Sequence, residues 1–399
     1  MDGVNARVRP LFSWRLLLWI IPALLACTSR PVSVAVILPE TGEWSVYGGP
    51  LAEGVRIAED YLREERMPDT PLRVRYYDSR SDPAEAVKAA EKALDRGAEA
   101  VLGAATTTEA LHMIPSADRH RRVLMSPSAS ATQLTGMSRY FFRVYPSDET
   151  EVKVAAKFIV ENLESLRVVL FVQDNVFSQS IARDLAAELK SLEGGSTSLR
   201  ILPADQGSLW DMVGKNMKSD PTTVYLAAYS GTLLQTLRAV RATGFTGAVV
   251  TTSAFNSPGI LQRAGPTAEG LYFLRPPMAG DARDNPVAAS FLTRYRERYR
   301  RDPEVFAAYG FDALLALAEA FRMAGDHPEE LPDRLRGITN LQGASGAIAF
   351  SASGEVLKVP QVFRIVTGKP VNLLDSMEQY RARMLQEIEK KRQELEIQR

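Results

Sequence analysis

Apolar, strand-like runs alternate with helix-forming stretches along most of this chain, and that alternation limits the folds open to it. Val32–Pro39 is rich in β-branched residues and carries no charge, as expected of a strand buried on both faces of a parallel sheet. Leu72–Tyr77, Ala100–Leu102 and Val123–Met125 are further strand candidates with helical stretches between them. Repeated strand–helix order predicts an α/β fold with helices on both faces of parallel sheets.

The same order returns in the second part of the chain. Two blocks, at about 31–145 and 148–270, predict two similar lobes, because 399 residues are too many for one typical core. Gly343–Lys369 breaks the pattern and predicts a β-hairpin with Gly354 in its turn, followed by another strand. The other strand candidates are Arg167–Val172, Thr223–Ala228, Ala248–Thr251 and Leu271–Leu274, and the helix candidates are Ser180–Leu189, Gly231–Thr243, Asn285–Tyr299 and Glu304–Met323.

The N-terminal residues have the features of an export signal. Arginines precede Leu16–Leu25, an apolar run that is too short to span a bilayer and suits the core of a signal peptide. The run ends in Leu-Leu-Ala-Cys27, which resembles the lipobox of bacterial lipoproteins, and Cys27 is the single cysteine of the chain. We therefore expect residues 1–26 to be a lipoprotein signal peptide and Cys27 to carry a lipid anchor.

Two alternatives for this region stay open, namely an uncleaved anchor or an ordinary signal peptide. Thr28 follows the cysteine, where an Asp often retains such lipoproteins at the inner membrane. In a bacterium with two membranes this favours a periplasmic protein anchored to the outer membrane.

The C-terminal residues differ from the rest in charge. Residues 376–399 are almost all helix-forming, highly charged residues, so they predict a terminal helix. Met377, Tyr380, Met384 and Ile388 would form a narrow apolar stripe on it. Either the helix is solvated, or the stripe contacts a partner.

Composition excludes several classes of function. The formal net charge is zero, so nothing in the charge balance favours nucleic-acid binding. Three scattered histidines and one cysteine make a zinc or disulfide site improbable, and we expect no metal and no cofactor. Nucleophile-elbow, P-loop, dinucleotide-binding and HExxH patterns are missing from the sequence, so we do not expect an enzyme.

Ala100–Ala110 is the stretch whose residues most favour a ligand site. Its apolar run ends at Gly103 and leads through Thr106 and Thr107 into a helical segment. Such a junction offers hydroxyls and backbone N–H groups at the positive end of a helix dipole. Ligands collect at the carboxyl ends of strands in open α/β sheets. A plain threonine N-cap without a ligand explains the same residues.

Several ordered motifs resemble one known family. The chain is similar to the type I periplasmic binding proteins, the branched-chain amino-acid-binding and receptor-ligand-binding group, over most of 32–370. The matching pieces, in order, are VAVILPETGEWSVYGGPLAEGVRIA, Asp78 with Asp82-Pro83, VLGAATTTEA, LMSPSASATQLT, FFRVYPSDETEV, AAYGFDALLALAEA and GASGAIAFSASGE. Each piece is weak singly, but their shared order is specific.

The resemblance implies two Rossmann-like lobes joined by three crossings, with the ligand in the cleft between them. Carried over, the first lobe comprises about 31–145 and 275–341, and the second about 146–274 and 342–372. Ligand binding would close the lobes by a hinge motion.

The resemblance also implies a ligand site. The hydroxyl and amide positions that match the family, at the ends of first-lobe strands, suit an acceptor such as a carboxylate. Aromatic positions match residues that line the cleft, although core packing explains such residues equally well. The implied ligand-binding residues are Tyr47, Thr106, Thr107, Ser128, Ala129, Ser130, Phe177, Tyr229 and Asn256.

Two departures from the family pattern bear on the ligand. Amino-acid binders of the family pair the ligand's ammonium with an acid near the end of a later second-lobe strand, where this chain has Ala254, Phe255 and Asn256. A buried ammonium without a counter-charge is costly. Phe177 and Ser178 also replace the family's usual Tyr and Gly. A less charged ligand, an aromatic or amphipathic acid, or no ligand then fits better than an α-amino acid.

Two functions follow from the resemblance. The first is an extracytoplasmic solute-binding lipoprotein that delivers a small organic ligand to the permease of an ABC-type transporter. The alternative is a lipoprotein of the same fold that acts through contact with an envelope protein, as an envelope regulator or a penicillin-binding-protein activator does.

Overall fold

The computed structural model describes residues 31–66, 72–192, 196–278, 284–325 and 327–374. The predicted signal peptide at 1–26, the lipidation site Cys27 and the C-terminal helix at 376–399 lie outside these ranges. Among the described residues, none of the helices combines the length and the apolar character that a membrane span requires.

The first lobe is built on a five-stranded sheet in the order β2-β1-β3-β4-β5. Every strand pairs with its neighbours in parallel. The strands are β1 (Val32–Leu38), β2 (Leu72–Asp78), β3 (Ala100–Leu102), β4 (Val123–Ser126) and β5 (Phe141–Arg143). The helices on its two faces are α2 (Pro83–Asp95) and α3 (Thr107–His120) on one, and α1 (Ser45–Tyr61) and α10 (Val305–Ala324) on the other.

Strand β1 shows why this sheet is covered on both faces. Val34 and Val36 pack into the core that contains α1 and α10, whereas Ala35 and Ile37 pack with α2 and α3. Alternate side chains of a strand point to opposite faces, so a run without polar residues has to be buried on both.

Helices α1 and α10 lie unusually close together. A Cβ added to Gly54 would be 1.8 Å from the carbonyl oxygen of Ala307, and one added to Gly310 would be 2.1 Å from that of Leu51. Only glycine allows such an approach of two backbones. Helix α10 comes late in the sequence, so this contact fixes it to the first lobe.

The second lobe is built on a seven-stranded sheet in the order β14-β13-β10-β9-β8-β6-β7. Strands β6 to β10 are parallel, and β13 and β14 add antiparallel pairs at one edge. The strands are β6 (Arg167–Gln173), β7 (Ser196–Leu202), β8 (Thr223–Ala227), β9 (Ala248–Thr251), β10 (Tyr272–Arg275), β13 (Gln361–Val366) and β14 (Lys369–Asn372). The helices are α4 (Asp148–Lys157), α5 (Val176–Ser191), α6 (Gln206–Met217), α7 (Ser230–Ala242) and α8 (Pro258–Ala264).

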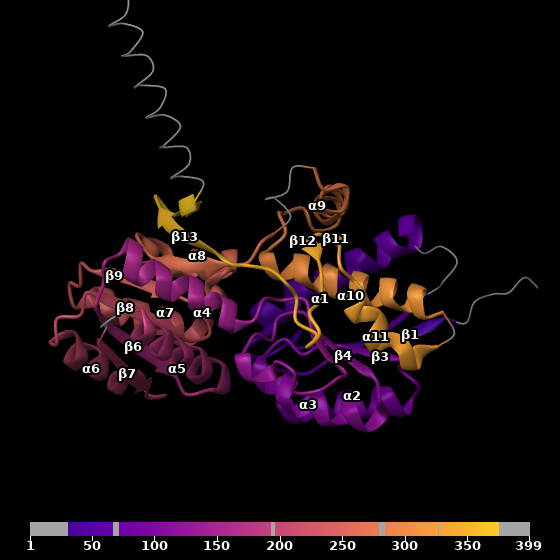
Figure 1. Cartoon of the computed structure of the whole chain (residues 1–399). Coiled ribbons are helices and arrows are strands. Elements are labelled where there is room, and N and C mark those ends of the chain that lie inside the picture. Colours follow the sequence, from indigo (N-terminus) through magenta and orange to yellow (C-terminus); the bar gives the residue numbers. More distant parts are fainter. Residues whose placement is uncertain (1–30, 67–71, 193–195, 279–283, 326, 375–399) are drawn as a thin grey trace, which may run out of the picture.

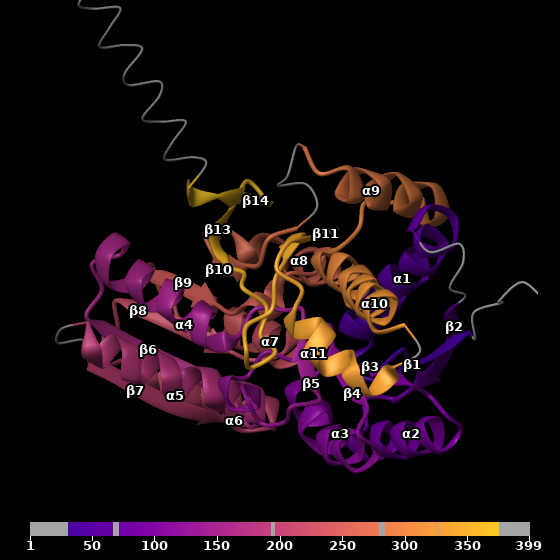
Figure 2. The same ribbon diagram turned by 45° about the vertical axis from the view of Figure 1, so that its right-hand side comes forward.

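Three segments connect the lobes. One runs from β5 to α4, a second from β10 to α9 (Pro286–Tyr299), and the third from the β11 (Leu341–Gly343) and β12 (Gly346–Ile348) hairpin to β13. Figures 1 and 2 show the two lobes side by side, with the late helices α9, α10 and α11 (Leu331–Arg336) on the first lobe. The finer lobe boundaries given above stay a prediction.

Most predicted elements are present, with ends that differ by a few residues. The predicted hairpin around Gly354 is wrong in its place, because the two-stranded ladder is formed by β11 and β12. Around Gly354 there is a single antiparallel bridge, between Phe350 and Val356, and Gly354 has a φ of 82°. The turn is therefore as predicted, but the following residues continue as a connection between the lobes.

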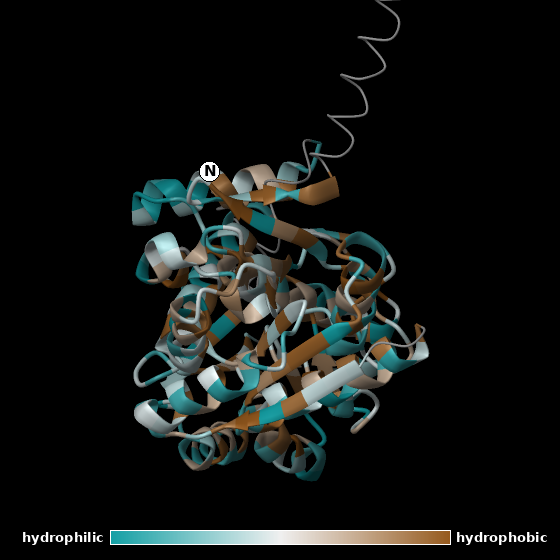
Figure 3. Ribbon diagram, turned by 90° about the vertical axis from the view of Figure 1, so that its left-hand side faces the viewer, coloured by the Kyte–Doolittle hydropathy of each residue, from teal (hydrophilic) through white to brown (hydrophobic). Residues whose placement is uncertain are grey.

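The sequence patterns above predict none of β5, α4, β7, α6, α8, α11 and β14. Strand β7 is an edge strand with mostly half-exposed and exposed residues, so it has no apolar run. Figure 3 shows hydrophobic stretches along the strands and more hydrophilic residues on the outer helices. Interior strands are recognised from their composition, whereas an edge strand shares its composition with loops.

Candidate functional site

A small cavity lies between the two lobes, where strand and helix ends meet. Its volume is about 30 Å³. Ligand pockets usually measure roughly 300–1,000 Å³, and one water needs about 10–15 Å³. The cavity is lined by Tyr47, Ala105, Ser128, Ser130, Tyr145, Phe177, Tyr229, Ser253, Ala254 and Phe306.

The lining includes some of the residues implied by the family resemblance and leaves others out. Five of the implied residues line the cavity: Tyr47, Ser128, Ser130, Phe177 and Tyr229. The other four, Thr106, Thr107, Ala129 and Asn256, are buried nearby without lining it. Tyr145 and Phe306 were missed, because an aromatic side chain in the sequence carries no sign of which neighbours it will meet.

Thr106 is the N-cap residue of α3. Its side chain accepts a hydrogen bond from the N–H of Glu109, while the Glu109 carboxylate accepts from the N–H groups of Ala105 and Thr106, each at 3.2 Å. This is a capping box at the start of α3. The N–H groups expected to meet a ligand at this junction are therefore bound to Glu109, as the N-cap interpretation has it.

The loop after β4 presents two of the lining serines. The Ser126 hydroxyl accepts from the N–H groups of Ser128 and Ala129, at 3.3 and 2.9 Å. The Ser128 hydroxyl donates to the carbonyl oxygen of Ala105, at 2.7 Å. These bonds tie the ends of β3 and β4 together and fix the wall of the cavity.

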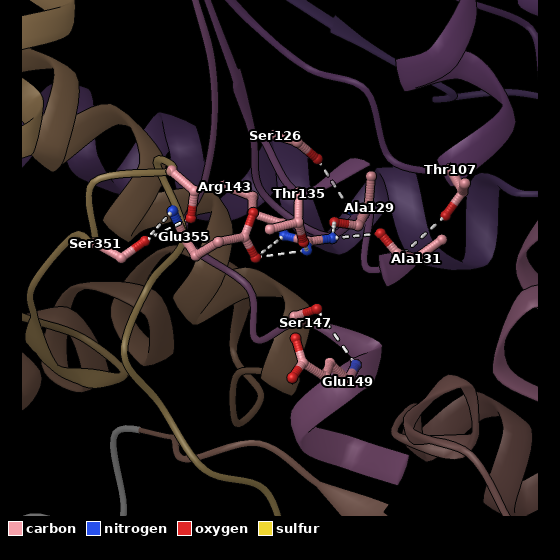
Figure 4. Close-up of polar contacts among 11 residues, drawn as sticks. Thr107, Ser126, Ala129, Ala131, Thr135, Arg143, Ser147, Glu149, Ser351 and Glu355 are labelled. Carbon is pink, nitrogen blue, oxygen red and sulfur yellow. Dashed lines mark hydrogen bonds and ion pairs between the residues drawn. The ribbon is translucent and has the colours of Figure 1, made fainter. Parts of the chain in front are cut away.

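Arg143 contacts the same loop, and Figure 4 shows its side chain between Glu355 and the segment with Ala129 and Ala131. Its guanidinium, fully buried, donates to the carbonyl oxygen of Ala131 at 3.0 Å and to the Thr135 hydroxyl at 2.8 Å. Its Nε donates to the Glu355 carboxylate at 2.7 Å. The ion pair therefore joins the loop and β5 to the third connection between the lobes.

Aromatic rings fill most of the cleft. The rings of Phe177 and Tyr229 stack with their centroids 4.9 Å apart, and the ring of Tyr47 contacts that of Phe306 edge to face with the centroids 5.2 Å apart. The ring of Tyr145 is parallel to that of Phe306, with the centroids 6.0 Å apart. This packing explains why the cavity is so small.

Tyr47 closes the cleft with its hydroxyl. It extends from α1 of the first lobe, donates to the carbonyl oxygen of Ala254 at 3.3 Å, and accepts from the N–H of Ser230 at 3.0 Å. Both partners belong to the second lobe. Burial raises the pKa of Tyr47 to about 12, while the hydrogen bond from Ser230 acts against this rise.

Two buried acids lie beside the cavity, and the sequence analysis did not single them out. Asp148 and Glu151 are in the first turn of α4, and both are almost completely buried. Glu151 accepts from the N–H of Ser253, a lining residue, at 2.9 Å. Among the described residues, no well-formed hydrogen bond reaches either carboxylate oxygen of Asp148, although the Ser130 hydroxyl acts on its charged form. Acids in a first helical turn usually favour the helix dipole at the surface, so the sequence signal was ambiguous.

The surroundings of the pair favour protonation. Burial raises the pKa of Asp148 well above its ordinary range, and the Glu151 carboxylate raises it further, against the Ser130 hydroxyl and Arg143. Burial raises the pKa of Glu151 to about 7, against its hydrogen bonds with Ser253. These are the shifts expected of carboxylates in a poorly solvated site.

The pKa values of the tyrosine hydroxyls around Asp148 and Glu151 are also raised. Burial raises the pKa of Tyr145 and of Tyr225, and the two carboxylates add to both shifts. The Tyr145 and Tyr225 hydroxyls are themselves buried without a partner among the described residues. The region next to the cavity therefore holds several polar atoms that a ligand or water could satisfy.

A group of possible metal ligands lies elsewhere. Glu91, Asp95 and His120 bring three ligand atoms within 4.8 Å of one another on the outer side of α2 and α3. Exposed acids commonly gather in this way without an ion, and none of the three residues lines the cleft cavity.

Known proteins of one family are similar to this chain over most of its length. The family model "Periplasmic binding protein" matches residues 31–368. A Leu/Ile/Val-binding protein of Citrobacter freundii is 22% identical over 331 residues, which cover 82% of this chain and 89% of the relative.

Solved structures of binding proteins are similar to this chain over most of its length. A leucine binding protein from Thermotoga maritima has a TM-score of 0.80 at 27% identity, with 86% of this chain and 97% of that chain covered. A branched-chain amino acid transporter substrate binding protein from Streptococcus pneumoniae, in complex with isoleucine, has a TM-score of 0.75 at 22% identity, with coverages of 86% and 100%.

Proposed function

Since this chain belongs to the periplasmic binding protein family, we propose that it captures a small organic solute between its lobes and delivers it to an ABC-type transporter. The relatives and structural neighbours are named as binding proteins and transporter components, not as enzymes. The family also places the folded region outside the cytoplasm.

The buried Asp148 carboxylate is the observation that best supports a ligand. No well-formed hydrogen bond from the described residues reaches its two oxygens, the Ser130 hydroxyl being the group that acts on them, and Glu151 lies in the same helical turn. Burying such a group without a donor is costly. A ligand that brings an ammonium group would supply the missing charge and donors.

Glu151 changes the expectation drawn from Ala254. An α-amino acid was disfavoured because no acid occurs at 254–256. Glu151 approaches the same position from α4, since its carboxylate accepts the N–H of Ser253. We therefore include amino acids and other primary amines among the candidate ligands, which agrees with the relative and the neighbours that are named for leucine, isoleucine or valine.

Such a ligand requires the cleft to open. A space of about 30 Å³ holds a few waters at most, so the ring contacts and the two hydrogen bonds of Tyr47 have to separate before a solute enters. Hinge motion between the lobes would provide this opening.

The test is a binding screen by thermal shift and calorimetry. Leucine would be compared with 4-methylpentanoate, which lacks the ammonium, and with isoamylamine, which lacks the carboxylate. A ligand at 100 times its Kd stabilises the folded state by about 2.7 kcal/mol. The proposal fails if a broad set of amino acids, amines and acids leaves the melting temperature unchanged.

Anchoring through Cys27 is a further part of the proposal and has its own test. The full chain should fractionate with membranes, and Cys27→Ser should release it. Retention of the Cys27→Ser variant in the membrane fraction would contradict a lipid anchor, and the membrane that retains the wild-type chain shows whether the outer membrane is used.

A second candidate function is contact with an envelope protein in place of transport. The filled cleft favours it, because rings and hydrogen bonds already occupy the space of a ligand. Deleting residues 376–399 should then abolish the cellular function while the binding screen stays negative. In the transport proposal the same deletion leaves solute binding intact.

A further inference from the structure

A second, larger cavity lies behind the cleft. Its volume is about 270 Å³, close to the lower end of the roughly 300–1,000 Å³ range of ligand pockets. It shares no lining residue with the first cavity. Its walls are Phe255, Asn256, Ser257, Leu261, Phe273, Arg275, Met278, Pro303, Glu304, Val305, Ile365 and Pro370.

The walls are mainly apolar and come from both lobes. The ring centroids of Phe255 and Phe273 are 5.2 Å apart, and both residues belong to the second lobe, as does Ile365 of β13. Pro303 and Val305 stand at the start of α10, which packs on the first lobe. An apolar molecule in this space would lose most of its contact with water, which is the main driving force for binding in such pockets.

One polar group in this cavity is incompletely satisfied. The side chain of Asn256 is only 6% exposed, and its Nδ2 donates to the carbonyl oxygens of Ser253 and Leu274 at 2.7 and 2.6 Å. These two bonds fix the orientation of the amide. Its Oδ1 is then a buried acceptor, without a donor among the described residues.

Glu304 adds a second acceptor to the same wall. No well-formed hydrogen bond from the described residues reaches its Oε2, although the Ser257 hydroxyl acts on the charged form of this carboxyl, and its Oε1 lies 3.9 Å from the Arg301 guanidinium. Arg275 lines the cavity too, with its guanidinium 3.8 Å above the ring of Phe363. With two arginines this close, a neutral donor is preferred over a cation.

We propose that this cavity is a second ligand site, which takes a small, largely apolar molecule with a hydroxyl group. The apolar body contacts Phe255, Leu261 and Val305, and the hydroxyl donates to Oδ1 of Asn256. Unpaired buried acceptors are rare in folded proteins, and a donor on the ligand removes this deficit. The site is independent of the solute proposed for the cleft.

The test uses 4-fluorobenzyl alcohol as the probe, followed by fluorine NMR on the folded full-length chain. 4-Fluorotoluene has the same ring and no donor, so it should bind about tenfold more weakly, as expected when one buried hydrogen bond is lost. Val305→Phe fills the cavity and should weaken the probe at least tenfold. Val359→Phe adds the same group at a 60% exposed position and should leave the affinity unchanged.

Three results would overturn the proposal. One is no saturable binding of the alcohol at millimolar concentration. Another is equal affinity for the alcohol and 4-fluorotoluene, which would leave Asn256 without a role. The third is loss of the probe in the cleft variant Asp148→Asn with retention in Val305→Phe, which would place the probe in the first cavity. Leu261→Phe fills the cavity from α8 and replaces Val305→Phe if that variant fails to fold.

Discussion

At the scale of single residues, Asp148 and Glu151 are the least expected feature of this protein. Two carboxylates in one helical turn repel each other, and burial adds to the cost of their charges. Here they stand beside a cavity in which three serines and three tyrosines are the polar lining residues. Their surroundings are therefore suited to a cationic ligand group, whose charge would stabilise both carboxylates.

The first prediction concerns the role of Asp148. Asp148→Asn should lower the affinity for an ammonium-bearing ligand about 10–100-fold, because a hydrogen bond to a charged group contributes roughly 1.5–3 kcal/mol. Above the raised pKa of Asp148, the same variant should be more stable than wild type when unliganded, because the asparagine carries no buried charge. Calorimetric titration and urea unfolding measure the two effects. Glu149→Gln, an exposed acid of the same turn, is the control and should change neither.

The second prediction concerns pH. The pKa of Glu151 is raised to about 7, so the folded state holds a proton that the unfolded state releases at lower pH. Glu151 should therefore make the stability of the unliganded protein fall as pH rises from about 4.5 to about 7, by an amount on the order of 3 kcal/mol. Asp148, whose pKa is also raised by burial, adds a fall of the same sign. Glu151→Gln should reduce the slope of unfolding free energy against pH, and the double variant Asp148→Asn/Glu151→Gln should flatten it. An unchanged slope in Glu151→Gln would rule out a contribution from Glu151.

Ligand affinity should change in the opposite direction. An ammonium favours ionised carboxylates, so protonation of Glu151 should lower the affinity for an amine ligand, by up to about tenfold per pH unit as pH drops below 7. Titrations of wild type and Glu151→Gln at several pH values separate this effect from general loss of stability. Affinity that is constant with pH would contradict recognition by the carboxylates.

At the scale of elements, a buried ion pair couples the loop after β4 to the connection that follows β12. Arg143 and Glu355 are 212 residues apart in the sequence. The Arg143 guanidinium bonds to carbonyl oxygens of the loop that carries Ser128 and Ser130. The geometry of the cleft wall therefore depends on a residue that does not line the cavity.

The matching prediction is a large loss of stability on breaking the pair. Arg143→Met leaves Glu355 buried without its partner, which should cost about 3–5 kcal/mol in the free energy of unfolding. Adding Glu355→Leu should recover much of this loss. Arg139→Met is the control, because its ion pair with Asp333 is exposed on both sides and should contribute less than about 1 kcal/mol. Denaturant unfolding measures all four proteins, and an Arg143→Met as stable as the control would refute this account.

At the scale of the whole molecule, the arrangement of the lobes rests on contacts made across the cleft. Tyr47 of the first lobe bonds to the backbone of Ser230 and Ala254 in the second, and it packs on Tyr229 at 5.7 Å. One buried apolar cluster also contains residues of both lobes, while each lobe has a further cluster of its own. Relative movement of the lobes then requires these contacts across the cleft to separate.

The prediction at this scale is that Tyr47→Phe favours a more open molecule. The variant keeps the ring but loses both hydrogen bonds, each with a net contribution of about 0.5–1.5 kcal/mol. Small-angle scattering of the unliganded protein should give a larger radius of gyration than wild type. Tyr140→Phe removes a hydroxyl away from the cleft and should leave the radius unchanged. An unchanged radius in both variants would mean that Tyr47 does not hold the lobes together.

Much of the fold follows from the sequence alone. The helix start at Asp82-Pro83 is confirmed, since the Asp82 side chain accepts from the N–H of Ala84. The α/β class, the strand–helix order and the family inferred from ordered motifs are confirmed as well. Local signals are enough here, because caps, turns and hydrophobic periodicity act between residues that are close in the chain.

Tertiary structure alone decided which of these residues meet. Tyr145 and Phe306 line the same cavity, Glu151 reaches the residue before Ala254, and Arg143 pairs with Glu355, although long stretches of chain separate the members of each set. It also decided that the amides at Thr106 bind Glu109 and that Asn256 faces the second cavity. Such contacts depend on how whole elements pack, and no local pattern encodes the neighbours of a side chain across two lobes.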